Sequence, residues 1–331
     1  MGNNGESKDV VHQPVMAGEI VEWLRPGGGG MYIDCTVGLG GHTEALLTAS
    51  TETQVLGIDR DPEALALARG RLSNFGGRAR LFQANFEDIR SVLESEGITE
   101  ARGILADLGV SSLQLERSER GFSFASDAPL DMRMDPESDL TAAELVNGLS
   151  ERDLADTIFE YGEERGSRKI ARAIVRQRAL GAINTTKQLA EIVVRALNIR
   201  GHWRIHPATR TFQALRIVVN DELRALERFI PAAISALERD GRLAIISFHS
   251  LEDRIVKRSF LRESGHCICE KRGPHPVLSP KDAAAGAVIC DSCGARKRVN
   301  VLTRRPLRPK EEEMERNPRS RSSLLRVCER V

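Results

Sequence analysis

The sequence predicts an α/β protein with a doubly wound, mostly parallel sheet and an inserted all-helical domain. Two observations lead to this prediction. Up to residue 107, short apolar runs that suit buried strands alternate with segments of helical period. Between residues 108 and 210 this alternation stops, and the pattern is helical from Thr141 onward. A sheet whose strands are joined by helices is therefore expected to carry a helical domain in one of its connections.

The first half of the sheet follows from four apolar runs. Strands are expected at residues 31–33, 55–58, 80–83 and 103–107, with helices at residues 17–24, after the glycines at 38–41, from Pro62, and at 89–96. Pro62 suits a first helical position because its missing N–H would have no partner there. Parallel strands bind ligands at their carboxyl ends, so Asp59 and Asp107, which end two of the strands, are candidate site residues.

The insertion begins with two helix-start signals. Thr141 with Glu144, and Ser150 with Asp153, have the spacing of capping boxes. The sheet is expected to resume after a single long helix over 211–237, with a strand at 241–248, a helix at 251–261, and β-prone segments at 300–305 and 323–330. We therefore expect residues 1–135 and 207–331 to form the sheet domain, and residues 136–206 to form the inserted helical domain.

A glycine turn after the first strand predicts a nucleoside site. Gly38, Gly40 and Gly41 precede a helix whose first N–H groups face back across the turn, and glycine lets a ligand approach the backbone. Asp59 follows Gly40 by nineteen positions at the tip of the second strand, where an acid can accept hydrogen bonds from both hydroxyls of a ribose.

The type of nucleoside follows from the missing third glycine. Thr43 occupies the position where the dinucleotide fingerprint requires glycine, so NAD is disfavoured. S-adenosylmethionine has the ribose but no pyrophosphate, and Asp34 is expected to face its ammonium group. The alternative, in which the glycines only make a strand-to-helix turn, stays open from this stretch alone.

Charge is distributed unevenly along a chain whose net charge is only +1. Residues 1–164 carry −17, whereas residues 165–216 carry +11 and residues 254–331 carry +10. Solvated helix faces usually mix acids with bases, so two basic blocks favour a polyanionic partner. Candidate phosphate-binding residues are Arg168, Lys169, Arg172, Arg176 and Arg178 in the insertion, and Lys297, Arg298, Arg304, Arg305, Arg319 and Arg321 near the C-terminus.

No apolar run is long enough to cross a membrane, and no secretory signal opens the chain, so a cytoplasmic protein is expected. In a reducing compartment the six cysteines argue against a disulfide framework. Cys267, Cys269, Cys290 and Cys293 form two close pairs that fit a tetrahedral zinc site, with free thiols as the alternative. Cys35 and Cys328 are expected to be small strand residues.

Several strings in the chain resemble one family of enzymes. They are HQPV (12–15), DCTVGLGGHT (34–43), GIDRDP (57–62), DLGVSS (107–112), RGFSF (120–124), HPATRTFQALRIVVNDEL (206–223), SFHSLEDRIVK (247–257) and RNPRSRSSLLRV (316–327). The chain closely resembles the bacterial family that methylates N4 of cytosine 1402 in 16S ribosomal RNA. The resemblance implies a class I methyltransferase fold and S-adenosylmethionine as cofactor. The implied cofactor contacts are Gly40, Gly41, His42, Asp59, Phe86, Asp107 and Gln114.

Given this resemblance, we also have expectations for the reacting residues, the partner and the rival functions. Asp107 is our candidate to accept the departing proton, with a purely cofactor-holding role as the alternative, and His249 is expected to be structural rather than catalytic. Phe122 and Phe124 either stack on the target base or pack in a core. The partner is expected to be 16S rRNA, within the small ribosomal subunit, and a homodimer is left open. A nonenzymatic RNA-binding or ribosome assembly protein and a small-molecule methyltransferase are the rival functions.

Overall fold

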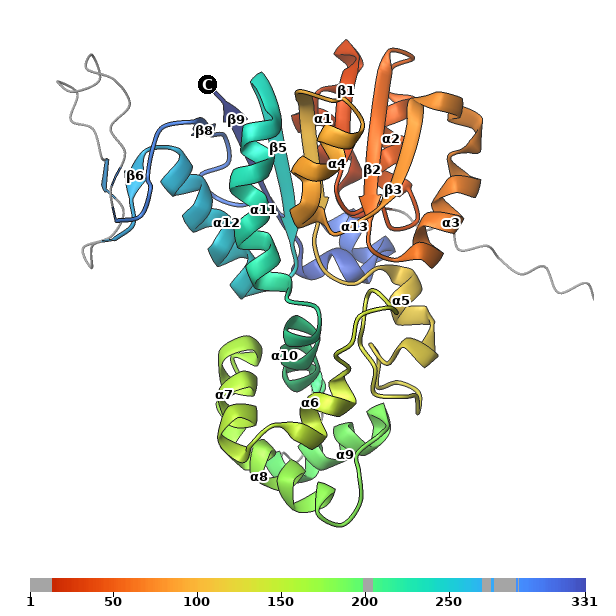
Figure 1. Ribbon diagram of the computed structural model, residues 1–331, viewed down its shortest axis with the longest axis vertical. Coiled ribbons are helices and arrows are strands. Elements are labelled where there is room, and N and C mark those ends of the chain that lie inside the picture. The colour runs from red at the N-terminus through yellow and green to blue at the C-terminus, as the bar shows by residue number, and fades with distance from the viewer. Residues whose placement is uncertain (1–13, 199–204, 270–274, 277–289, 291) are drawn as a thin grey trace, which may run out of the picture.

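The structure is a computed structural model, and it describes residues 14–198, 205–269, 275–276, 290 and 292–331. His12 and Gln13, the first two residues of the first resembling string, lie outside these ranges. Figure 1 shows an upper body, in which helices cover both faces of a sheet, and a lower body made of helices.

The sheet has seven strands in the order β3-β2-β1-β4-β5-β9-β8. The strands are β1 (Gly30–Asp34), β2 (Thr53–Asp59), β3 (Ala79–Gln83), β4 (Ala101–Asp107), β5 (Leu237–Ser247), β8 (Val299–Val301) and β9 (Leu324–Arg330). β1 to β5 are mutually parallel, and β9 lies antiparallel to both of its neighbours. Successive strands are added on one side of β1 up to β3 and on its other side from β4 onward, so the sheet is doubly wound, as the sequence predicts.

Alternate residues of the strands enter two different cores. Ile33, Leu56 and Ile104 pack against α4 (Ile89–Ser95), α11 (Glu222–Ala236) and α12 (Ser250–Glu263) on one face. Their neighbours, such as Tyr32 and Leu105, pack against α1 (Ala17–Leu24), α2 (Gly41–Thr48) and α3 (Pro62–Arg71) on the other. A strand buried on both faces reads as a continuous apolar run, which is why these strands could be predicted.

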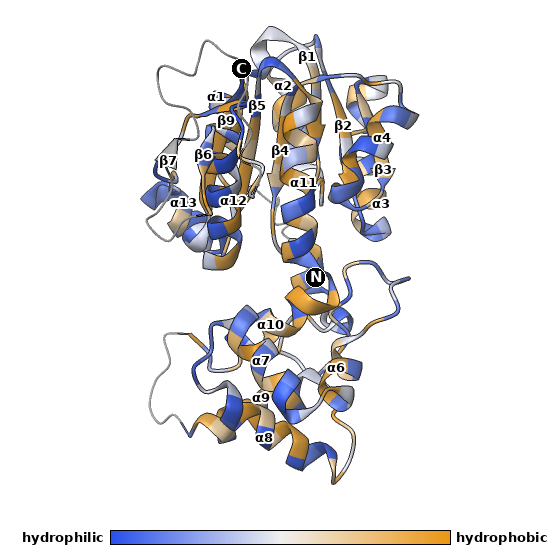
Figure 2. Ribbon diagram, turned by 60° about the vertical axis from the view of Figure 1, so that its left-hand side comes forward, coloured by the Kyte–Doolittle hydropathy of each residue, from blue (hydrophilic) through white to orange (hydrophobic). Residues whose placement is uncertain are grey.

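The lower body has a hydrophobic core of its own. It contains α6 (Ala142–Gly148), α7 (Glu151–Gly162), α8 (Ser167–Arg178), α9 (Thr186–Leu197) and α10 (Thr209–Val219). Its helices carry hydrophobic and hydrophilic residues on different sides (Figure 2), and the predicted capping box of Thr141 and Glu144 is formed. This core uses side chains from Phe122 to Val219, a wider span than 136–206. We propose boundaries for the helical domain close to these two residues.

The single long helix expected over 211–237 is wrong. The chain forms α10 and α11, separated at Asn220 and Asp221, and Asp221 has a left-handed φ of 48°. α10 packs in the helical core and α11 packs on the sheet, so the break is where the chain passes from one body to the other. Asn220 fixes the junction, because its side chain accepts a hydrogen bond from Met134 N (2.8 Å) and donates one to the Met132 carbonyl (2.8 Å).

Candidate functional site

A cleft lies at the carboxyl ends of the parallel strands, where the two bodies meet. Its lining comes from the segments that follow β1, β2, β3, β4 and β5, together with Met134 and Glu222 at the junction and Asn317 and Arg319 from the C-terminal segment. Because ligands of doubly wound sheets bind at this edge, the cleft is the expected place for a cofactor. It contains six of the seven cofactor residues implied by the resemblance; Gly40 is the exception.

The carboxylate of Asp59 is hydrogen-bonded to the glycine turn. The N–H of Gly38 donates to Asp59 Oδ2 at 2.7 Å, and the N–H of Asp61 donates to Oδ1 at 2.9 Å. Burial raises the pKa of Asp59 to about 6, although these two N–H groups favour the charged form. The carboxylate faces the cleft beside the turn, which is the arrangement expected for an acid that binds a ribose diol.

The glycines of the turn have different roles. Gly40 has a φ of 82°, and a Cβ there would lie 3.2 Å from Leu72 Cδ1, so it shapes the turn from behind the cleft. Gly41 lines the cleft, and its Cβ would lie 3.1 Å from Pro14. The prediction that Asp34 faces a ligand ammonium is wrong, because this buried carboxylate accepts hydrogen bonds from Thr43 Oγ1 (2.7 Å) and Thr36 N (3.2 Å) behind the cleft lining.

A buried histidine, His42, and a partly buried acid, Asp107, form a pair in the cleft lining. His42 Nε2 lies 3.3 Å from Asp107 Oδ2, and the imidazole is only 5% exposed. Burial by itself would lower the pKa of His42, but the carboxylates of Asp107 and Asp34 together raise it above its ordinary value. The contact of His42 Nε2 is an ion-pair contact without hydrogen-bond geometry, and His42 Nδ1 and Asp107 Oδ1 have no hydrogen-bond partner among the described residues. Buried polar atoms are normally paired, so these two point to a missing ligand.

Phe86 and Gln114 both line the cleft. Phe86 packs edge-on against Phe229, with ring centroids 5.2 Å apart, and one side of it remains in the cleft. Gln114 belongs to α5 (Ser112–Glu116), where it donates to Asp61 Oδ2 (3.1 Å) and accepts from Ser111 N (3.0 Å). The Gln114 amide is therefore engaged with the protein and supports the wall of the site.

Two acids that line the cleft are not among the site residues predicted from the sequence. Glu222 and Glu252 line the cleft, Arg216 binds Glu222 through two contacts of 2.8 Å, and His249 Nε2 lies 3.2 Å from Glu252 Oε1. His249 also caps α12, which fits the structural role expected for it. The capping spacing from His249 to Glu252 is a signal in the sequence that would have located this acid. No such signal marks Glu222, because its place in the cleft depends on the break between α10 and α11.

The two predicted basic groups are not brought together. Arg168, Lys169, Arg172 and Arg176 are exposed on α8, which Figure 1 places at the end of the helical body remote from the sheet. Arg319 lies at the cleft instead, and Arg321 is exposed near it in sequence. Arg178 and Arg298 were expected to bind phosphate, but Arg178 donates to the Val146 carbonyl and Arg298 is bound to Glu263 at 2.6 Å; both have protein partners.

The aromatic candidates for base stacking lie in the helical core. Phe122 is buried there, and Phe124 stacks on His206 with centroids 4.5 Å apart. Neither is part of the cleft lining, so the core alternative describes them. The four cysteines at 267–293 meet at a separate place, away from the cleft. Cys328 is buried in β9, as expected, whereas Cys35 is buried just after the end of β1 rather than in the strand, and it lines the cleft.

Comparison with known proteins agrees with this geometry. Residues 9–331 match the MraW methylase family. A protein of Geotalea uraniireducens named ribosomal RNA small subunit methyltransferase H is 48% identical over 98% of this chain and 99% of its own length. A protein of the same name from Heliobacterium modesticaldum is 46% identical over 97% and 98%.

The chain also has a weaker likeness to solved structures. An rRNA methylase from Streptococcus thermophilus is 11% identical, with a TM-score of 0.38 over 92% of this chain and 87% of that one. The sequence matches, by contrast, span nearly the whole chain. On those matches, this chain belongs to the MraW methylase family.

Proposed function

We propose that the chain transfers a methyl group from S-adenosylmethionine to N4 of cytosine 1402 in 16S ribosomal RNA. The observation that carries this proposal is one cleft that holds both Asp59, beside the glycine turn, and the His42–Asp107 pair. The relatives named ribosomal RNA small subunit methyltransferase H support the class of substrate. The strings that resemble the cytosine-methylating family support the particular nucleotide.

The residues of the cleft fit the proposed cofactor. Asp59 offers a carboxylate for the two ribose hydroxyls, and Gly41 keeps the backbone bare where a Cβ would meet Pro14. Phe86 offers an aromatic edge for the adenine, and His42 Nδ1 and Asp107 Oδ1 are buried polar atoms that a ligand can pair. When bound, S-adenosylmethionine supplies a methyl group on a sulfonium that is already activated for transfer.

Asp107 is the residue we assign to the reacting amino group. Its Oδ1 can accept a hydrogen bond from N4, which turns the nitrogen lone pair away from the ring and provides an acceptor for the departing proton. His42 holds the other carboxylate oxygen at 3.3 Å and so fixes the direction of Oδ1. The cleft walls restrict the base to one orientation, and such positioning supplies much of the remaining rate.

The RNA is proposed to approach across both bodies. The target base must leave its stack or be presented unpaired to reach the cleft. Arg319 is at the cleft, and it pairs with the exposed Glu116 at 3.2 Å, a pair that phosphate can replace at little cost. The exposed basic residues of α8 would hold phosphates farther along the RNA, where they position it without reading its sequence.

We further propose that the assembled small subunit is the substrate, and that the protein acts on it in the cytoplasm. No described helix could span a membrane.

The test is transfer of labelled methyl to 16S rRNA and to small subunits that lack the modification, followed by mapping of the labelled nucleotide. We expect label on N4 of cytosine 1402, with subunits labelled faster than free RNA. Label on a ring carbon or on a ribose oxygen would contradict the proposed chemistry. Equal rates for free RNA and subunits would contradict only the assembled substrate.

Two rival functions are separated by simpler measurements. A nonenzymatic RNA-binding protein has no use for Asp59 beside a glycine turn, so affinity for S-adenosylmethionine that disappears in Asp59→Ala argues against it. A small-molecule methyltransferase has no use for a basic α8. A steep fall of RNA affinity with salt therefore argues against that function.

A further inference from the structure

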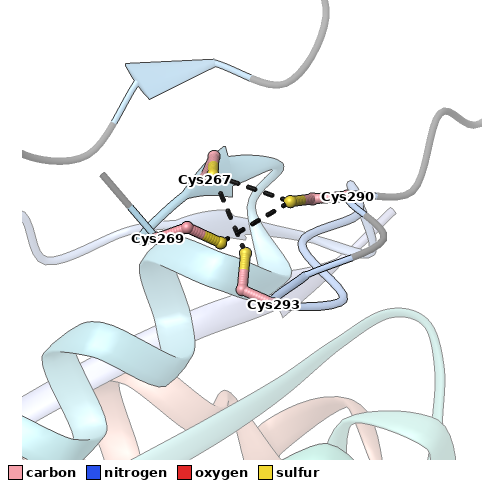
Figure 3. A group of neighbouring side chains, drawn as sticks. All are labelled: Cys267, Cys269, Cys290 and Cys293. Carbon is pink, nitrogen blue, oxygen red and sulfur yellow. Dashed lines mark hydrogen bonds between the residues drawn. The ribbon is translucent and has the colours of Figure 1, made fainter.

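Four cysteine sulfurs meet outside the cleft, beside the C-terminal end of α12 (Figure 3). Cys267 ends the short strand β6 (His266–Cys267) and Cys269 follows it, whereas Cys290 and Cys293 precede β8. The Cys267 and Cys290 sulfurs are 3.6 Å apart, the Cys269 and Cys290 sulfurs 3.7 Å, and the Cys293 and Cys267 sulfurs 3.9 Å. All four sulfurs lie within 4.8 Å of one another.

These separations are those of a tetrahedral metal site. Four thiolates at a Zn–S distance of about 2.3 Å have sulfurs about 3.8 Å apart, close to the three separations given above. A disulfide would need sulfurs about 2.05 Å apart, and no disulfide joins the cysteines in the described part of the chain. Each of Cys267 and Cys290 approaches two other sulfurs, so the arrangement is a group of four rather than two separate pairs.

The backbone around the cysteines supports thiolates. Gly294 has a left-handed φ of 69°, and its N–H donates to the Cys290 carbonyl at 2.7 Å, which closes a tight turn between the second pair. The backbone N–H groups of Ile268 and Ala295 are directed at the Cys293 sulfur. Donors of this kind stabilise a negatively charged sulfur and orient it toward a metal.

We propose that Cys267, Cys269, Cys290 and Cys293 bind one structural Zn²⁺ ion. Four protein sulfurs leave no open coordination position, so the ion would stabilise the fold and take no part in methyl transfer. On binding, the four thiols release their protons to solvent. The site would join the end of α12 to the start of β8, a junction that the Arg298–Glu263 pair (2.6 Å) and the bridge between Ser264 and Lys297 also hold.

Metal analysis of the intact chain tests the proposal. Protein produced with zinc in the medium and purified without chelator should contain one zinc per chain by mass spectrometry of the metals. A mercurial that blocks thiols should release this zinc to a colorimetric chelator. The double variant Cys290→Ser with Cys293→Ser should lose the metal. The matched variant Cys35→Ala with Cys328→Ala, which alters two buried cysteines of the sheet core, should keep it.

A second measurement is independent of whether the serine variant folds. The wild-type chain loaded with Co²⁺ should show the visible absorption of tetrahedral cobalt with four thiolates, and added Zn²⁺ should remove it. Zinc well below one per chain, with all four thiols open to a thiol reagent in the native protein, would overturn the proposal. So would iron in place of zinc, or a disulfide between any two of the four cysteines.

Discussion

Asp59 combines two opposing influences at one carboxylate. Two backbone N–H groups hold it in place, while burial raises its pKa to about 6. Hydrogen bonds from a ribose diol would favour the charged form, because a carboxylate is the stronger acceptor. Binding of the cofactor and loss of the Asp59 proton should therefore be linked.

The first prediction concerns this linkage. Affinity for S-adenosylmethionine should fall as pH is lowered from 7 to 5, approaching tenfold per pH unit below the pKa of Asp59. Asp59→Asn should bind about 10- to 100-fold more weakly at pH 7.5 and lose most of this pH dependence, since one charge-assisted hydrogen bond contributes roughly 1.5–3 kcal/mol. Calorimetric titration across this pH range measures both effects.

The control for Asp59 is Asp88→Asn, an exposed acid outside the cleft lining. It should keep the affinity and the pH profile of the wild type. An unchanged profile in Asp59→Asn would place the titrating group elsewhere.

The second prediction separates the two roles considered for Asp107. Asp107→Asn keeps the size of the side chain but removes the charge beside His42. A proton acceptor contributes about 10²- to 10⁴-fold to a rate, so single-turnover methyl transfer at saturating cofactor should fall by that factor while cofactor affinity changes less than about tenfold. A large loss of affinity with a nearly normal rate would instead assign Asp107 to cofactor holding.

Asp59 and Asp34 show what the spacing of residues can and cannot predict. The spacing of Asp59 from Gly40 predicted its place in the cleft, because strand ends in a parallel sheet meet at one edge. Asp34 ends a strand as well, yet Thr43 and Thr36 satisfy its carboxylate inside the protein. Spacing indicates which edge a side chain occupies, but the partners that turn it inward are known only once the fold is formed.

At the scale of elements, the break between α10 and α11 determines the shape of the site. The break places Glu222 in the cleft. It also lets the apolar residues of α10 pack in the helical core while those of α11 pack on the sheet, although they form one continuous pattern in the sequence. The sequence pattern predicted a single helix because apolar positions recur on both sides of Asn220 and neither glycine nor proline marks the junction. Asn and Asp tolerate left-handed backbone better than other residues, and this was the only available signal.

The third prediction concerns this junction. Asn220→Ala removes the hydrogen bonds to Met134 N and to the Met132 carbonyl and leaves buried backbone groups without partners. The free energy of unfolding should fall by about 1–3 kcal/mol, measured as a lower urea midpoint. The exposed Asn74→Ala should unfold like the wild type. Equal midpoints for the two variants would mean that the junction does not depend on Asn220.

At the scale of the whole molecule, the basic residues lie on both bodies. Composition predicted a polyanionic partner, but it could not predict that α8 and Arg319 would be on different bodies, because charge counts along a chain say nothing about which surfaces come together. If both groups of residues bind RNA, as proposed, the RNA contacts the protein at points well beyond the reacting base.

The fourth prediction tests that extended contact. Arg168→Glu with Arg176→Glu should weaken RNA binding and reduce the slope of log affinity against log salt by about 0.7–0.9 for each phosphate that the variant no longer binds. Affinity for S-adenosylmethionine should not change, since α8 lies outside the cleft lining. Arg90→Glu with Arg239→Glu, two exposed positions outside the cleft and α8, makes the same change in net charge. An equal loss of RNA affinity in both double variants would mean that net charge alone matters.

The antiparallel strand β9 lies inside the sheet. Within the part of the chain that the structure describes, only the three residues of β8 form a regular ladder with its outer side, and Leu302, Thr303 and Leu307 add further hydrogen bonds to it. If β8 detached, β9 would become an open sheet edge with buried side chains such as Leu325 and Val327 next to it. Exposed edges of this kind pair with other chains and aggregate. If the proposed zinc site holds β8 in place, oxidation of its four cysteines or a strong chelator should therefore make the protein precipitate before it unfolds.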